Sequence, residues 1–126
     1  PESTRQTTTV ETPTKSGSQK VHVFEGNDVA SFEKLLKDTN LVVVDFFADW
    51  CSPCKRALPV VDALAQEHSD VLFVKVNTEK SSAVAKKYGV KGIPRFLFFK
   101  GGTKVDDLTG FDDKKALEER VVKLKS

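Results

Sequence analysis

The chain has 126 residues, of which 20 are Lys or Arg and 18 are Asp or Glu, so its formal net charge is +2. This length suits one domain, and a composition that is 39% hydrophobic and 30% charged is typical of a soluble globular protein. The near balance of charge argues against a nucleic-acid or membrane-binding surface, and no apolar run approaches the roughly 20 residues of a membrane span.

Residues 1–19 differ in composition from the rest of the chain. Nine of these nineteen residues are Ser or Thr, Val10 is the only aliphatic residue, and none is aromatic. Such a segment buries too little apolar surface to offset its loss of conformational entropy on ordering. We therefore expect a disordered tail over residues 1–19, either a solvated end or the remainder of an organelle-targeting peptide, followed by one domain over residues 20–126.

The first part of the domain predicts two strands separated by a helix. Val21–Phe24 is a short β-type run, and either Asn27 or Asp28 suits the N-cap of a helix whose apolar residues recur on one face. Leu41–Phe47 is almost continuously apolar and β-branched. That pattern predicts a central strand buried on both faces.

The middle of the domain repeats this alternation. A second helix follows Cys51, and we expect Pro59 inside it to kink it because proline removes a backbone donor. Val71–Val76 is the third predicted strand. Ser81–Tyr88 is a short predicted helix that ends at Gly89, since glycine commonly follows the last helical turn.

The last part predicts a hairpin and a final helix. Phe96–Lys100 and Thr103–Leu108 flank Gly101-Gly102, a pair typical of a two-residue hairpin loop. Asp112 is the expected N-cap of the last helix. The resulting order, β-α-β-α-β-α-β-β-α, predicts an α/β fold with a parallel sheet core and an antiparallel edge.

The only two cysteines, Cys51 and Cys54, are too few for a disulfide scaffold or a Cys-rich zinc site, and their spacing indicates redox chemistry. We expect no metal and no cofactor. On the first turn of a helix the two side chains face one side and can close a small disulfide. Cys51 lies at the helix N-terminus, where free N–H groups favour a thiolate, so we predict that it is the nucleophile. Cys54 is then placed to attack a mixed disulfide from within, and Pro53 suits the first turn.

Val44–Lys55, which contains Trp-Cys-Ser-Pro-Cys, together with Pro59, resembles the active-site segment of the thioredoxin family. Val90–Pro94 resembles the cis-proline loop of that family, and Gly110 matches its glycine near the final helix. The resemblance covers roughly residues 21–126. It implies the thioredoxin fold, a central mixed sheet of about five strands flanked by four helices.

The resemblance also implies an activity, the reduction of protein disulfides through a reversible Cys51–Cys54 disulfide. Asp45 would be the buried carboxylate that takes and returns the proton of Cys54 through water. A carboxylate inside an apolar strand is costly to bury, and burial should raise its pKa. Lys75 would be the charged partner of Asp45, although a lysine that extends its ammonium to the solvent is an equally good interpretation.

Six residues would form the substrate-binding surface in a protein of this family: Trp50, Ser52, Pro53, Ile93, Pro94 and Arg95. Trp50 would shield the disulfide, and a cis Pro94 would place the Ile93 backbone opposite it. Two of the six depart from the family pattern, since Ser52 replaces a usual Gly and Arg95 replaces a common Thr. A third departure is Phe47, at a position where many members have a second Trp, which we interpret as a change in packing.

The expected partners are disulfide-containing proteins and a thioredoxin reductase, either a flavoprotein or a ferredoxin-linked enzyme, and we expect a monomer. No secretory signal and no Asn-x-Ser/Thr sequon is visible, which favours a reducing intracellular compartment, cytoplasmic first and mitochondrial or chloroplast second. Two alternatives stay open. One is a redox-idle interaction module with this fold, and the other is an oxidase or isomerase of an oxidising compartment, which the Ser52-Pro53 interior disfavours.

Overall fold

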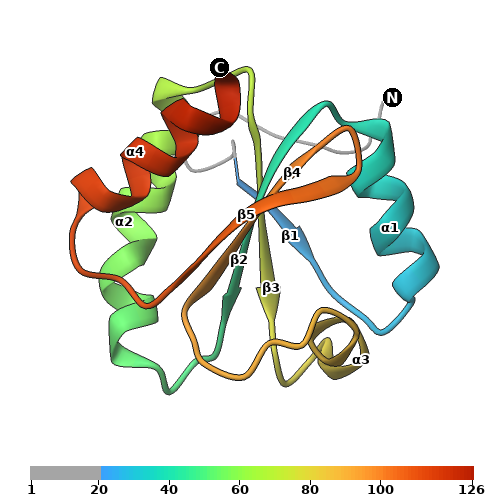
Figure 1. The fold of residues 1–126 in the computed structure, drawn as a ribbon. Coiled ribbons are helices and arrows are strands. Elements are labelled where there is room, and N and C mark those ends of the chain that lie inside the picture. The colour runs from blue at the N-terminus through green and yellow to red at the C-terminus, as the bar shows by residue number, and fades with distance from the viewer. Residues whose placement is uncertain (1–20) are drawn as a thin grey trace, which may run out of the picture.

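The computed structural model describes residues 21–126, so the expected tail over residues 1–19 lies outside the described residues. Within them the elements follow the predicted order (Figure 1). They are β1 (Val21–Phe24), α1 (Val29–Asp38), β2 (Leu41–Phe47), α2 (Ser52–Glu67), β3 (Leu72–Asn77), α3 (Ser82–Lys87), β4 (Arg95–Lys100), β5 (Thr103–Thr109) and α4 (Lys114–Lys125).

The five described strands form one mixed sheet in the order β1-β3-β2-β4-β5. Strands β1 and β2 both pair in parallel with β3, whereas β4 is antiparallel to β2 and β5 is antiparallel to β4. This arrangement confirms the predicted parallel core and antiparallel edge. It also places β2 in the middle of the sheet.

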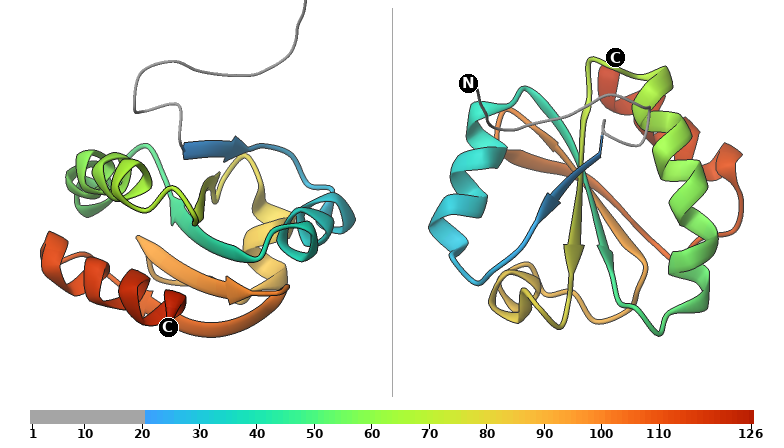
Figure 2. Two further views of the ribbon diagram at one scale, coloured as in Figure 1. Left: turned by 90° about the horizontal axis from the view of Figure 1, so that it is seen from above. Right: turned by 180° about the vertical axis from the view of Figure 1, so that it is seen from behind.

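Helices cover both faces of the sheet. Figures 1 and 2 show α2 and α4 together on one side and α1 and α3 on the other. Each pair encloses its own apolar cluster: Val43, Phe73 and Phe98 pack with the α2 and α4 side, and Val44 and Leu97 pack with the α1 and α3 side. Because alternate residues of a strand point to opposite faces, β2 contributes to both clusters.

The burial of β2 confirms the sequence prediction for a central strand. Its first six residues are all buried, and only Phe47 at its end is partly exposed. One of the buried residues is Asp45, which is 2% exposed. A strand with apolar layers on both sides therefore carries one carboxyl group into the interior.

The hairpin between β4 and β5 forms as predicted. Gly101 and Gly102 are its two loop residues, with φ of +61° and +87°, a conformation that residues with a Cβ rarely adopt. A Cβ on Gly102 would also lie 3.0 Å from Cγ of Lys37. Both backbone freedom and a close approach to α1 therefore favour glycine at this turn.

The last helix begins one residue later than predicted. Asp113, and not Asp112, is the N-cap of α4, since its side chain accepts a hydrogen bond from the backbone N–H of Ala116 at 2.9 Å. An N-cap carboxylate has to reach the amide two or three residues ahead, and that geometry selects one of two adjacent aspartates. At the first helix the open choice is settled in favour of Asp28, which caps α1 through Ser31.

Other differences from the sequence predictions are small. Strand β3 is shifted by one residue from the predicted Val71–Val76, and α2 continues through Pro59. None of the helices between residues 21 and 126 has the length and apolar character needed to cross a bilayer.

The capping assignment predicts a difference between two neighbouring aspartates. We expect Asp113→Ala to lower the free energy of unfolding by about 1 kcal/mol, because the amide of Ala116 loses its acceptor. The matched control Asp112→Ala should change it by less than about 0.5 kcal/mol. Urea denaturation of both variants measures the difference, and a reversed order of effects would restore Asp112 as the cap.

Candidate active site

The two cysteines lie where the central strand gives way to a helix. After β2 ends, the backbone N–H of Cys51 donates to the carbonyl of Ala48 at 3.2 Å, which closes a turn. Cys51 is the N-cap of α2, and its Sγ accepts a hydrogen bond from the backbone N–H of Cys54 at 3.2 Å. The sulfur therefore occupies the position in which a helix N-terminus stabilises negative charge.

Cys51 and Cys54 are joined in a disulfide, with a Cα–Cα distance of 5.2 Å. Both are almost fully buried, at 4% and 2% exposure. Pro53 is in the first turn of α2, as predicted, and Ser52 between the cysteines is exposed. The structure therefore confirms that the pair can form a disulfide.

The loop before β4 packs against this disulfide. The Ile93–Pro94 peptide bond is cis, as the resemblance implies. Ile93 packs on the small apolar cluster that contains both cysteines. The backbone N–H of Gly110 donates to the Pro94 carbonyl at 2.7 Å, so the end of β5 holds this loop in place.

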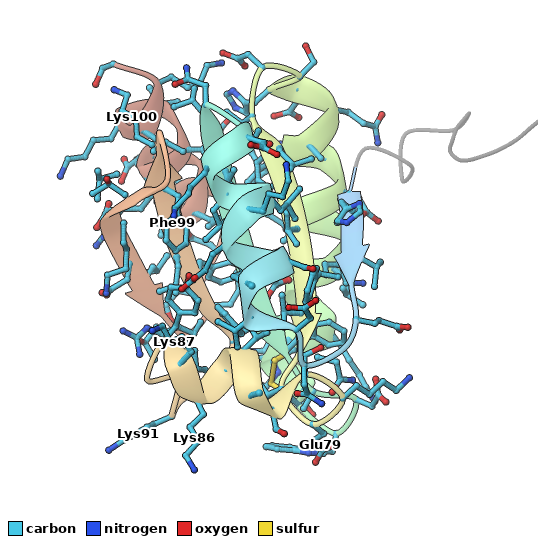
Figure 3. The ribbon with its side chains drawn as sticks, turned by 90° about the vertical axis from the view of Figure 1, so that its right-hand side faces the viewer. Glu79, Lys86, Lys87, Lys91, Phe99 and Lys100 are labelled. Atoms are coloured by element: carbon cyan, nitrogen blue, oxygen red, sulfur yellow. A yellow bond between two sulfur atoms is a disulfide. The ribbon has the colours of Figure 1, made fainter. Side chains whose placement is uncertain are left out.

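Trp50, the only tryptophan of the chain, is the most exposed large apolar side chain near the disulfide, at 67%. Its indole Nε1–H donates to Oε2 of Glu79 at 2.9 Å. The buried side chain of Asn77 in turn accepts the backbone N–H of Glu79 at 2.8 Å. Figure 3 shows Glu79 at the same end of the molecule as the disulfide. No local sequence pattern connects Glu79 with Trp50, so only the folded chain brings the two together.

Asp45 lies opposite Lys75 in the register of β2 and β3. Among residues 21–126, neither oxygen of its carboxyl group has a hydrogen-bond partner. Desolvation by burial raises the pKa of Asp45 from the ordinary value of 3.8 to about 7, while the charge of Lys75 acts in the opposite direction. Both sequence expectations, burial and a raised pKa, therefore hold in the structure.

Lys75 is half-buried, and its ammonium lies over an aromatic ring. The distance from its Nζ to the centroid of the Phe47 ring is 5.0 Å, within the range of a cation–π interaction. Phe47 also lines a cavity of about 300 Å³ with five other residues, Ala48, Asp49, Cys54, Lys55 and Leu58. The residue that we interpreted as a packing change thus contacts a charged group of the site.

Arg95 follows the cis-proline loop, and its charge has a partner. Its Nη2 lies 3.4 Å from Oδ2 of Asp107 on β5, and its side chain is 19% exposed. The carboxylate of Asp107 therefore partly balances the positive charge of the Arg95 guanidinium. Asp107, like Glu79, was not recognised in the sequence.

A second group of polar side chains lies at the other end of α2. In the described part of the chain, Glu67, His68 and Glu118 bring three potential metal-ligand atoms within 4.8 Å of one another. Lys114 contacts Glu67 at 3.0 Å, and Lys125 lies 3.0 Å from Nδ1 of His68. These two cations fit an ion-pair network better than a metal site, because a bound cation would have to compete with them.

A buried Cys-x-x-Cys disulfide at a helix N-terminus, on a mixed α/β sheet whose central strand carries a buried carboxyl group, defines a dithiol–disulfide oxidoreductase. The sulfur that caps the helix is positioned to react as a thiolate. The second sulfur is held one turn away and closes the ring. The fold and the disulfide together identify the class of protein.

Comparison with known proteins gives the family. Residues 23–123 match the family model described as Thioredoxin. The chain is 48% identical over 79 residues to a thioredoxin of Chlamydia caviae, which covers 63% of this chain and 78% of that protein. It is 40% identical over 98 residues to a chloroplastic M-type thioredoxin of Pisum sativum, covering 77% of this chain and 57% of the pea protein.

A solved structure agrees with these sequence matches. The oxidised mitochondrial thioredoxin 3 of Saccharomyces cerevisiae superimposes with a TM-score of 0.77 at 31% identity, over 86% of this chain and 99% of the yeast chain. The chain belongs to the thioredoxin family. It is a protein-disulfide reductase whose substrates are disulfides and whose dithiol is restored by a thioredoxin reductase.

The raised pKa of Asp45 predicts how the stability of the oxidised protein depends on pH. The folded protein retains a proton that the unfolded chain releases, so the free energy of unfolding should fall as the pH rises from about 4 through about 7. Asp45→Asn should remove this fall and make the variant more stable than the wild type at pH 8, by up to about 4 kcal/mol.

Denaturant unfolding at pH 4, 6 and 8 measures the effect. The exposed neighbour Asp49 supplies the control, since Asp49→Asn should keep the pH dependence of the wild type. Parallel curves for Asp45→Asn and the wild type would show that Asp45 does not hold the proton.

Proposed function

We propose that the chain reduces a partner's disulfide in two exchanges, with Cys51 acting first. The Cys51 thiolate attacks one partner sulfur, forms an intermolecular disulfide and releases the other partner sulfur, which takes up a proton. Cys54 then loses its proton and attacks Sγ of Cys51, so that the Cys51–Cys54 disulfide closes and a second partner thiol leaves. Two electrons pass from the dithiol to the partner. The N-cap position of Cys51 is the observation that carries this order of events.

In this proposal Asp45 is the acceptor for the proton of Cys54, relayed by water. A base works best when its pKa lies near the working pH, and burial raises the pKa of Asp45 to about 7. Lys75, opposite it on β3, keeps part of the Asp45 population ionised by attraction. Cys51, Cys54, Asp45 and Lys75 then form the catalytic set.

The substrate-binding surface is proposed around the disulfide, from the start of α2 and the residue before Cys51 to the cis-proline loop and the start of β4. Its members are Trp50, Ser52, Pro53, Ile93, Pro94 and Arg95. The exposure of Trp50 supports its place on this surface. The packing of Ile93 on the apolar cluster that contains the disulfide supports the place of Ile93. The pairing of Arg95 with Asp107 favours a mainly steric role for Arg95, since its charge is partly balanced.

We further propose that the protein acts as a monomer in a reducing intracellular compartment. The cytoplasm is the first candidate, and a mitochondrion or chloroplast is the second, as in the yeast and pea relatives. The reductase is either a flavoprotein or a ferredoxin-linked enzyme. Reduction rates with one reductase of each class distinguish the two, and sedimentation of the reduced protein tests the monomer.

The order of the two cysteines predicts different outcomes for their serine variants. Cys54→Ser should accumulate intermolecular disulfides with its substrates, because the first attack occurs and the second cannot. Cys51→Ser should abolish insulin-disulfide reduction and trap nothing. Non-reducing electrophoresis after mixing each variant with oxidised insulin reads the adduct directly. Trapping by Cys51→Ser, or normal turnover by Cys54→Ser, would reverse the assignment. A wild type that reduces no disulfide would instead leave a redox-idle interaction module.

A further inference from the structure

The contact between Lys75 and Phe47 has a geometric cause. Phe47 and Asp45 are two residues apart on β2, so their side chains point to the same face of the sheet. Lys75 enters that face from β3, directly opposite Asp45. Its ammonium nevertheless lies 5.0 Å from the centre of the Phe47 ring, while both oxygens of the Asp45 carboxyl group have no hydrogen-bond partner among the described residues.

The ring is a second group that attracts the Lys75 ammonium, besides the buried carboxylate. An ammonium on a flexible four-carbon chain gains hydration by moving into water, and the face of an aromatic ring is an alternative site that attracts it. Phe47 lines the cavity of about 300 Å³ that Cys54 also lines. The ring that contacts the cation thus also borders the cavity that the resolving cysteine lines.

Few other charges act in this region. Asp49 and Lys55 line the same cavity and are exposed. The neighbours of the pair on the flanking strands are uncharged, namely Val23 opposite Lys75 on β1 and Phe96 opposite Asp45 on β4. From the α2 and α4 side, this face of the sheet is covered by an apolar cluster that includes Ala57, Val61 and Leu117. Lys75 is the charged group that acts on the carboxyl group of Asp45.

We propose that Phe47 is a positioning residue for the second exchange: its ring holds the Lys75 ammonium near Asp45 and so sets how readily Asp45 accepts the proton of Cys54. This inference rests on the proposed function for the role of Asp45. Without the ring, the ammonium moves into water. The attraction between Lys75 and the carboxylate then weakens, and a larger share of Asp45 is protonated at neutral pH.

The direct test is an NMR titration of the Asp45 carboxyl carbon in the oxidised protein, assigned by its loss in Asp45→Asn. Phe47→Leu should move the titration midpoint upward by about half a pH unit or more, in the same direction as Lys75→Gln. Phe47→Trp, which keeps an aromatic face, should retain the midpoint of the wild type. In a Lys75→Gln background, Phe47→Leu should cause no further shift, because the cation that the ring holds is gone.

A matched control separates this effect from a general loss of packing. Phe111 is a half-buried phenylalanine that packs on the core outside the cavity lining, so Phe111→Leu should leave the midpoint unchanged. An unchanged or lowered midpoint in Phe47→Leu would overturn the proposal. An equal shift with and without Lys75 would overturn it as well, since the ring would then act on Asp45 independently of the cation.

The consequence for the second exchange is measured separately. With a mixed disulfide preformed on Cys51, Phe47→Leu should slow the attack of Cys54 at pH 7 by about two- to fivefold and move the pH profile of this step upward. Phe47→Trp should keep the rate and the pH profile of the wild type. Because the titration needs no substrate, its result is independent of the reductase activity. A shifted midpoint with an unchanged pH profile would refute the role of Asp45 as acceptor, and an unshifted midpoint would refute the role of Phe47.

Discussion

The burial of β2 on both faces is the constraint on which the rest of the structure depends. With β3 on one edge, β4 on the other and a helical layer above and below, every position of the strand except the last is removed from water. Such a strand is rigid and accurately placed. The turn that follows it carries Cys51 to the N-cap of α2, so the sulfur is positioned by the best-packed element of the fold.

The same burial creates the electrostatic character of the site. A carboxyl group at Asp45 costs free energy to ionise in this environment, and that cost brings its pKa to about 7. Lys75 offsets part of the cost from the neighbouring strand. A fully formed ion pair would keep the carboxylate ionised and make it a weak base, whereas the loss of the cation would leave a larger share of it protonated at neutral pH. In the proposed mechanism, the contact of Lys75 with Phe47 holds the cation between these two extremes, so that Asp45 exchanges a proton near neutral pH.

Two large side chains of the proposed binding surface are each held by a carboxylate. Trp50, which precedes Cys51, and Arg95, which begins β4, both have a carboxylate partner, Glu79 and Asp107 respectively. Each pair limits the freedom of a large side chain, which in the proposed binding surface would reduce the entropy lost when a partner protein binds. The pairing also reduces the positive charge that Arg95 presents, so the departure from the usual Thr changes shape more than charge.

The amino-acid sequence by itself determined the order of the elements, the buried central strand, the glycine hairpin, the redox cysteines and the thioredoxin resemblance. These depend on local patterns, since periodicity, turn residues and the Cys-x-x-Cys spacing lie within a few residues of one another. The choice of Asp113 over Asp112 and the partners of Trp50, Lys75 and Arg95 were decided by the tertiary structure alone. Each of those contacts depends on strand register, on the exact residue at which a helix starts, or on a rotamer. A cation such as Lys75 that has both a carboxylate and an aromatic ring within reach adopts the position that the packed side chains around it leave open.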